Sequence, residues 1–117
     1  MNLENVAAVV TGGGSGLGRA TAIALAQRGA RVGVIDLDEN AATAVANGID
    51  GLAIACDVSD AESAASAVDR VIEQFGVPRV LINCAGIGVA ARIVGRDGPH
   101  SLDLFANVIR VNLIGTF

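Results

Sequence analysis

The feature that most constrains this chain is the segment Thr11–Gly18, TGGGSGLG, which holds five glycines in eight residues. An apolar run, Val6–Val10, precedes it, and apolar residues recur at helical spacing from Gly16 to Arg28. Because glycine is a poor former of both strands and helices, a cluster here predicts a tight turn that carries a buried strand into a helix. The unpaired N–H groups and the dipole at the start of such a helix form an anion-binding site, which glycines leave open to close approach.

Strand-like and helix-like segments alternate along the rest of the chain. Further strands are expected at Arg31–Asp36, Leu52–Val58 and Val80–Asn83, and helices at Glu39–Ala46, from Ser59 to Phe75 and at Leu102–Phe117, with a loop at Ala85–Pro99. Ser59 and Glu62 have the spacing of a capping box, Ser101 is the expected N-cap of the last helix, and Asn47-Gly48 is expected to stop the second one. This alternation predicts an α/β fold of the Rossmann type, a doubly wound parallel sheet in the order 3-2-1-4 with helices on both faces.

All four expected strands are apolar enough to be buried on both faces, including Val80–Asn83. None of them is protected by a charge or a proline against pairing with another strand, as an exposed edge strand would require. We therefore expect residues 1–117 to be one domain, an N-terminal portion that supplies the front half of a larger sheet.

Composition and charge exclude several classes of function. The net charge of −4 and the pI of about 4.7 argue against nucleic acid and against an anionic membrane as partners. No apolar stretch approaches the roughly 18 residues of a transmembrane helix, and the start of the chain lacks the basic region of a signal peptide. Cys56 and Cys84 are too few for a disulfide framework, so free thiols and a cytoplasmic location are expected.

A carboxylate ends the second expected strand. Asp36 lies 18 residues beyond Gly18, near the spacing of about 20 at which a carboxylate accepts hydrogen bonds from the adenosine ribose. The same charge would repel a 2′-phosphate, and neither Ser15 nor Leu37 offers a compensating positive charge, which favours NAD over NADP. Alone, the glycines are compatible with a simple packing turn and Asp36 with a strand-end turn, but together on adjacent strand ends they favour dinucleotide binding.

Two further strand ends carry weaker signals. Asp57, in Cys56-Asp57-Val58, is placed to accept from an adenine amino group, although an Asx turn before a helix explains it equally well. Asn83-Cys84-Ala85-Gly86 ends the fourth expected strand with small residues against which a flat cofactor can lie, and an ordinary loop is the alternative.

Taken together, these segments resemble the N-terminal half of the short-chain dehydrogenase/reductase family over essentially the whole chain. The resemblance is carried by Thr11-Gly12-x-x-x-Gly16-x-Gly18, Asp36, Asp57-Val58, Asn83-Cys84-Ala85-Gly86 and Val111–Phe117. The segment from Asn83 to Phe117 further resembles the type 2 3-hydroxyacyl-CoA dehydrogenase branch, which has Cys in the NxAG motif and a longer loop before the next helix. The family sheet implied by this resemblance is seven-stranded.

The resemblance implies an NAD site and assigns residues to it, with no metal. The implied cofactor-binding residues are Gly12, Ser15, Gly16, Leu17, Gly18, Asp36, Asp57, Val58, Asn83, Cys84, Ala85 and Gly86. Among them, Ser15, Gly16 and Leu17 would border the pyrophosphate and Asp36 would hold the ribose. Asp57 and Val58 would hold the adenine. Cys84, Ala85 and Gly86 would line the ribose on the nicotinamide side.

The resemblance also implies an activity, the NAD-dependent interconversion of a secondary alcohol and a ketone. The expected substrate is 3-hydroxyacyl-CoA, with an acyl-carrier or steroid substrate as the competing class, and the expected assembly is a homo-oligomer, a dimer or tetramer. Family chemistry uses a Tyr as general acid/base and a Lys four residues later. This chain has no Tyr, and all eight of its basic residues are Arg. The catalytic pair is therefore expected beyond Phe117. The alternative is a stand-alone nucleotide-binding or regulatory module without catalysis.

Two other polar residues are candidates for chemistry. Asn112 matches the family's helix asparagine, which supports a water-linked proton relay, and it is the catalytic residue expected within this chain. Without the family context it would be a polar residue on an amphipathic helix. His100 is the only histidine, and we expect it to be an exposed loop residue because no acidic partner is in view.

Overall fold

The structure is a computed structural model that describes residues 1–117, and its centre is a four-stranded sheet in the order β3-β2-β1-β4. The strands are β1 (Ala7–Thr11), β2 (Arg31–Asp36), β3 (Leu52–Ala55) and β4 (Val80–Asn83). All three pairings are parallel, with Thr11 opposite Ile35 on one side and opposite Asn83 on the other. The predicted α/β class, strand order and parallel pairing are therefore confirmed.

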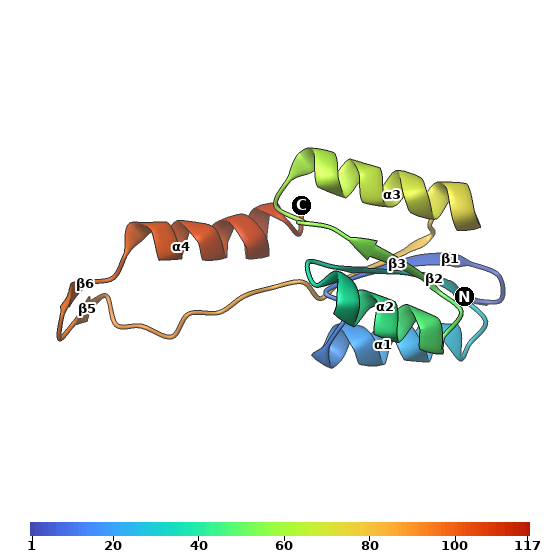
Figure 1. Cartoon of the computed structure of the whole chain (residues 1–117), viewed down its shortest axis with the longest axis horizontal. Coiled ribbons are helices and arrows are strands. Elements are labelled where there is room, and N and C mark those ends of the chain that lie inside the picture. The colour runs from blue at the N-terminus through green and yellow to red at the C-terminus, as the bar shows by residue number, and fades with distance from the viewer.

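Helices cover both faces of this sheet. The helices are α1 (Gly16–Ala26), α2 (Glu39–Gly48), α3 (Ala61–Phe75), α4 (Leu102–Ile109) and the π-helix η1 (Arg110–Ile114). Helices α1 and α2 lie against one face and α3 against the other, whereas α4 projects away from the sheet (Figure 1). Residues 87–101, here called the arm, run beside α4 and end in a short antiparallel hairpin, β5 (Val94–Gly95) and β6 (Gly98–Pro99).

The hydrophobic core has two layers because side chains alternate between the faces of each strand. Val10 and Val34 are fully buried on the side of α1 and α2, where Ala42 and Val45 complete the contact. On the opposite side, Val9, Ile35 and Ile54 pack against Ala67 and Val71 of α3. These two layers hold the carboxyl ends of β1, β2 and β3 in fixed positions at one edge of the sheet.

Two helix boundaries differ from the predicted ones. Helix α2 continues through Gly48, and the chain reverses instead at Asp50, which adopts φ of +51°. Helix α3 is capped by Asp60, whose carboxylate accepts from the N–H of Ser63 at 2.7 Å, so the predicted capping box with Ser59 is wrong. A carboxylate is favoured at a helix N-terminus by its charge, and Ser59 forms hydrogen bonds with Asp57 instead.

Burial of β4 on both faces was predicted and is wrong. Leu81 is 58% exposed and Asn83 is exposed, while Val80 and Ile82 are half-buried. The reason is that β4 is an edge strand with β1 as its only neighbour. Its apolar sequence therefore faces the core on one side and solvent on the other.

The C-terminal part of the chain is more irregular than predicted. The expected helix Leu102–Phe117 is divided into α4 and η1, with a hydrogen bond of 2.9 Å from the N–H of Gly115 to the carbonyl of Arg110. Ser101 caps α4 as predicted, but neither α4 nor η1 contains a buried residue. The predicted loop at Ala85–Pro99 contains the β5–β6 hairpin.

Two further findings concern the whole chain. None of its helices has the length and apolarity needed to cross a membrane. Both cysteines are free thiols, as predicted.

Candidate functional site: a cavity at the strand ends

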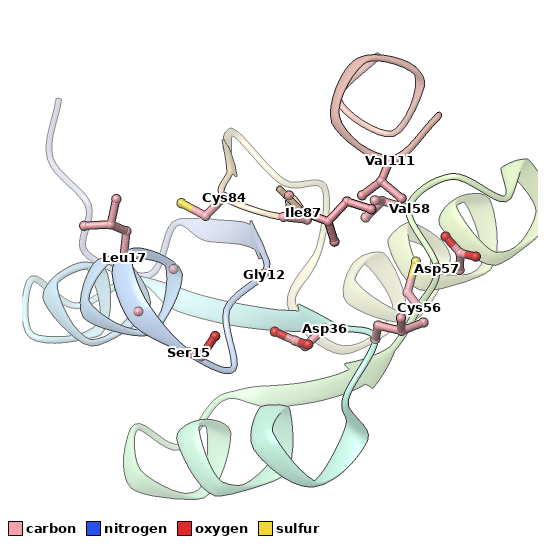
Figure 2. Close-up of a pocket in the computed structure, with 15 residues that line it drawn as sticks. Gly12, Ser15, Leu17, Asp36, Cys56, Asp57, Val58, Cys84, Ile87 and Val111 are labelled. Atoms are coloured by element: carbon pink, nitrogen blue, oxygen red, sulfur yellow. The ribbon is translucent and has the colours of Figure 1, made fainter. Parts of the chain in front are cut away.

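A cavity of about 420 Å³ opens where the strands end and α1 begins, and it is called the strand-end cavity below (Figure 2). Eleven of the twelve cofactor-binding residues predicted from the sequence line it; the exception is Asn83. Leu37, Cys56, Ile87 and Val111 complete the lining and were not predicted. Each of them is adjacent in sequence to a predicted site residue, and that adjacency is the signal that could have found them.

The N-terminus of α1 differs from those of the other α-helices. Side chains of Asp38, Asp60 and Ser101 cap α2, α3 and α4, each by accepting a backbone N–H of the first turn. The N-cap of α1, Ser15, is extended and forms no side-chain capping hydrogen bond. The first-turn N–H groups of α1 therefore face the strand-end cavity without a protein carboxylate or hydroxyl on them, an arrangement that suits an anionic ligand.

The glycines serve both packing and access. A Cβ at Gly12, where φ is +62°, would lie 2.7 Å from the N of Ala85, and a Cβ at Gly18 would overlap the carbonyl oxygen of Gly12. Gly16 also has a positive φ, of +52°, but a Cβ there would meet nothing within 4 Å. Gly12 and Gly18 thus allow the glycine turn, the helix and the end of β4 to approach one another, while Gly16 leaves open space in front of α1.

Asp36 lies beside the glycine turn, and both oxygens of its carboxylate are held by backbone N–H groups. Oδ2 accepts from Gly14 at 2.9 Å and Oδ1 accepts from Asp38 at 3.0 Å. Figure 2 shows the carboxylate directed towards the turn that carries Gly12 and Ser15. An ionised carboxylate has about four acceptor positions, so it retains capacity for the hydroxyls of a ligand.

Asp57 is the second acidic residue of the cavity. Its Oδ1 accepts from the hydroxyl of Ser59 at 2.6 Å and from the N–H of Ser59 at 2.9 Å. These two hydrogen bonds lower the pKa of Asp57, with a smaller contribution from the charge of Arg110, while partial burial opposes them. Asp57 is therefore ionised at neutral pH and keeps Oδ2 free of protein partners.

Thr11 connects the glycine turn to the end of β4. Its buried hydroxyl accepts from the N–H groups of Cys84 and Ala85, both at 3.2 Å, and donates to Oδ1 of Asn83 at 3.3 Å. Thr11 begins the glycine motif but was not predicted to be a site residue. Its position shows that it orders two walls of the cavity.

Asn83 was predicted to bind the cofactor, but the structure places it outside the strand-end cavity. Its side chain bridges the hydroxyl of Thr11 and the carbonyl of Thr116, to which Nδ2 donates at 3.3 Å. Asn83 instead lines a second, more apolar cavity of about 330 Å³ that β4, α3 and η1 share. The reason is the alternation of β4, which turns Asn83 to that side of the sheet.

Asn112, the predicted catalytic residue, uses its side chain to hold the arm. Its Oδ1 accepts from the N–H of Ile87 and its Nδ2 donates to the carbonyl of Ile87, both at 2.8 Å. Asn112 does not line the strand-end cavity, whereas Ile87 does, and His100 lies outside the lining as well. Within this chain Asn112 therefore shapes one wall through Ile87.

The sequence of this chain is similar to those of known dehydrogenases. The family model for short chain dehydrogenase matches residues 6–117. D-threitol dehydrogenase from Mycolicibacterium smegmatis is 38% identical over 98% of this chain and 45% of its own length. 3-hydroxyacyl-CoA dehydrogenase type-2 from Bos taurus is 38% identical over 99% of this chain and 46% of its own length.

The fold of this chain is also similar to that of a solved structure. The 3-ketoacyl-(acyl-carrier-protein) reductase from Brucella melitensis, complexed with NADH, has a TM-score of 0.89 and 34% identity over 97% of this chain and 47% of its own. The chain thus spans less than half the length of each of these proteins. The uncapped helix, the open glycine turn and the carboxylates fit a nicotinamide dinucleotide, the cofactor class that the NADH-complexed reductase supports. With the strand order and the glycine motif in place, the chain belongs to the short-chain dehydrogenase family.

Proposed function

We propose that this chain is the cofactor-binding part of an NAD-dependent oxidoreductase that interconverts a secondary alcohol and a ketone. The observation that carries the proposal is the uncapped N-terminus of α1, which opens into the same cavity as Asp36. A helix N-terminus favours a pyrophosphate and a carboxylate favours ribose hydroxyls.

The choice of NAD over NADP rests on the charges around the cavity. Asp36 and Asp57 are both acidic, and no Arg is among the lining residues. A 2′-phosphate beside Asp36 would bring two negative charges together without a cation to compensate them. A ribose 2′-hydroxyl, in contrast, is a hydrogen-bond donor and matches a carboxylate acceptor.

The substrate class that we propose is 3-hydroxyacyl-CoA. It is supported by the Bos taurus relative and by the sequence around Cys84, while the Mycolicibacterium smegmatis relative makes a polyol the competing class. The chemistry that NAD would supply when bound is acceptance of a hydride from the carbinol carbon of the substrate. The chain's own residues hold the dinucleotide: the first turn of α1 binds the pyrophosphate, Asp36 the ribose, and Asp57 with Val58 the adenine. The carbinol proton needs a positioned acceptor of suitable pKa, which we place in the remainder of a longer protein because this chain has no Tyr or Lys.

The cofactor proposal is tested by calorimetric titration of the 117-residue chain with NADH and with NADPH. NADH should bind more tightly, and Asp36→Asn should weaken NADH binding by about tenfold to a hundredfold, the usual cost of losing charge-assisted hydrogen bonds. Asp38→Asn is the matched control, because Asn still caps α2. Tighter binding of NADPH than of NADH by the unaltered chain would contradict the assignment of Asp36.

The substrate proposal is tested on the longer protein by comparing 3-hydroxybutyryl-CoA with D-threitol and following nicotinamide absorbance. Higher kcat/KM with the thioester is expected. The 117-residue chain alone should transfer no hydride to either product ketone, and measurable transfer would place the acid/base group within it.

A further inference from the structure

Charge is distributed unevenly along this chain, and the arm, residues 87–101, differs from the part before it. Residues 1–86 hold five arginines and ten acidic residues, a net charge of −5, whereas the arm holds two arginines and one aspartate, a net charge of +1. The strand-end cavity has the sign of the larger part, since Asp36 and Asp57 line it and no arginine does. The negatively charged end of a substrate is therefore repelled by the cavity and attracted by the arm.

Both arginines of the arm are available to a ligand. Arg96 lies in the turn between β5 and β6, and Arg92 lies two residues before β5. Both side chains are exposed, and neither forms a hydrogen bond or an ion pair, in contrast to the hydrogen-bonded guanidinium groups of Arg28, Arg31 and Arg110. A free guanidinium presents its donors in a planar fork that matches the oxygens of a phosphate.

Apolar surface lies beside these cations. Ile93 and Val94, which stand between the two arginines in the sequence, are 84% and 71% exposed. The hairpin holds them in place, with Val94 opposite Pro99 and a hydrogen bond of 2.8 Å from the N–H of His100 to the carbonyl of Ile93. An exposed apolar patch next to phosphate-binding side chains suits a nucleotide, in which a flat base is joined to phosphate groups.

The arm is connected to the strand-end cavity through Ile87, which lines it. Arg92 is five residues further along the chain, at most about 18 Å away if the segment is fully extended. Figure 1 shows this segment running out from the sheet to the hairpin beside α4. A ligand that reaches both places needs a reactive end and a charged end joined by a long chain. 3-hydroxyacyl-CoA has this form, because its pantetheine chain separates the thioester from a diphosphate and a 3′-phosphate.

We propose that the arm binds the nucleotide end of the acyl-CoA substrate, with Arg92 and Arg96 as specificity-determining residues that contact its phosphates. The inference rests on the proposed function, since it takes 3-hydroxyacyl-CoA as the substrate class. It extends that function by assigning the preference for coenzyme A esters over alcohols without phosphates to two residues outside the cavity.

The test measures kcat/KM of the longer protein with two thioesters that have the same reacting atoms. 3-hydroxybutyryl-CoA carries the phosphates, and 3-hydroxybutyryl-N-acetylcysteamine lacks them. Arg92→Gln combined with Arg96→Gln should lower kcat/KM for the CoA thioester by about threefold to thirtyfold, the range for losing two exposed ion pairs. The value for the short thioester should change by less than about twofold. The KM of the unaltered protein for the CoA thioester should also rise with salt concentration, because exposed charges are screened.

Two further double variants serve as controls. Arg70→Gln with Arg79→Gln removes the same charge from two exposed arginines outside the arm and should leave kcat/KM for both thioesters unchanged. Arg92→Lys with Arg96→Lys keeps the charge of the arm without the planar fork and should recover part of the loss. The unfolding temperature should be the same in all variants of the arm, since neither arginine contributes a hydrogen bond to the fold.

The outcomes are distinct. No turnover of either thioester by the unaltered protein overturns the proposed substrate class, and this inference with it. Turnover of both thioesters, with an equal loss or no loss in the Arg92→Gln, Arg96→Gln variant, overturns the role of the arm alone. A loss confined to the same acyl group carried on an acidic acyl carrier protein also overturns it, because the arm would then bind a protein surface.

Discussion

The side-chain amide of Asn112 pairs with the backbone of Ile87 through two hydrogen bonds of 2.8 Å, one accepted and one donated. The two residues are 25 positions apart, one in η1 and one at the start of the arm. Ile87 and Val111, the residue before Asn112, both line the strand-end cavity. This pair therefore joins the two segments that form the cavity wall opposite the glycine turn.

Replacing Asn112 with Ala should loosen that wall. Both hydrogen bonds are lost at an exposed position, so the expected cost is about 0.5–1.5 kcal/mol of local stability, or a twofold to tenfold weaker NADH affinity. Limited proteolysis should cut the arm faster than in the unaltered chain. Asn107→Ala is the control, because the Asn107 side chain accepts a hydrogen bond from Arg110 and forms none with the arm. Equal proteolysis rates in the two variants would show that the Asn112–Ile87 pair does not hold the arm.

Thr11→Val should destabilise the whole sheet. The substitution keeps the shape but removes a buried hydroxyl that makes three hydrogen bonds, leaving the N–H of Ala85 without this acceptor. An unmade buried hydrogen bond of this kind costs about 1–3 kcal/mol, which urea unfolding measures directly. Thr11→Ser retains the hydroxyl and should recover most of the loss. A Thr11→Val chain as stable as the unaltered one would contradict this role.

Ser59→Ala should change how the free energy of unfolding depends on pH below neutrality. The pKa of Asp57 is lowered below 3.8 mainly by the Ser59 hydroxyl. A depressed folded-state pKa contributes stability that is complete above the unfolded pKa and is lost as pH falls through the folded pKa. Removing the hydroxyl raises the folded-state pKa, so the variant should have less of this stabilisation at neutral pH and a smaller loss of it on acidification.

The measurement for Ser59→Ala is thermal unfolding from neutral pH down to about pH 3, with the Asp57 carboxyl followed by carbon NMR. The gap between the two proteins, about 1 kcal/mol at neutral pH, should narrow as the pH falls. Asp57→Asn removes the titrating group, and in that background Ser59→Ala should give a gap that no longer depends on pH. A pH-dependent gap in that background would assign the effect to another residue.

The chain should associate with itself through α4 and η1. Phe105 of α4 and Leu113 of η1 are 55% and 65% exposed, and neither helix contains a buried residue. Light scattering should show concentration-dependent association, and Phe105→Glu should weaken it by about tenfold or more, since burial of such a side chain contributes about 1.5–3 kcal/mol. Ala106→Glu adds the same charge without removing a large apolar side chain and should weaken association less. A chain that stays monomeric at high concentration would contradict this prediction.

The sheet and most of the cavity could be predicted because their signals are local. The bounds of β2, Arg31–Asp36, follow from one apolar run, and the glycine turn and Asp36 meet because parallel strands end at the same edge. The choice between Ser59 and Asp60 as the cap of α3 could not be made from spacing, because it depends on Asp57 binding Ser59.

Other features depend on partners far away in the sequence. An apolar run such as Val80–Asn83 gives no information on which of its faces is covered. The displacement of Asn83 from the cavity follows from the face of β4 on which it lies. The pairing of Asn112 with Ile87 depends on where α4 and η1 lie relative to β4. Only tertiary structure fixes that relation, so a motif that names these asparagines does not reveal what they contact.

The projection of α4 and the arm divides the molecule into two parts of unequal cooperativity. The radius of gyration is 15.8 Å, whereas about 13 Å is typical of a compact domain of this size. The sheet part holds every buried residue, so its amides should exchange with solvent only on global unfolding, while those of α4 should exchange through local opening. The strand-end cavity lies across this boundary, with Asp36 on the cooperative side and Val111 on the other. A dinucleotide that contacts both sides must order the weaker part as it binds. The observed affinity is therefore lower than the intrinsic affinity by the free energy needed to order α4.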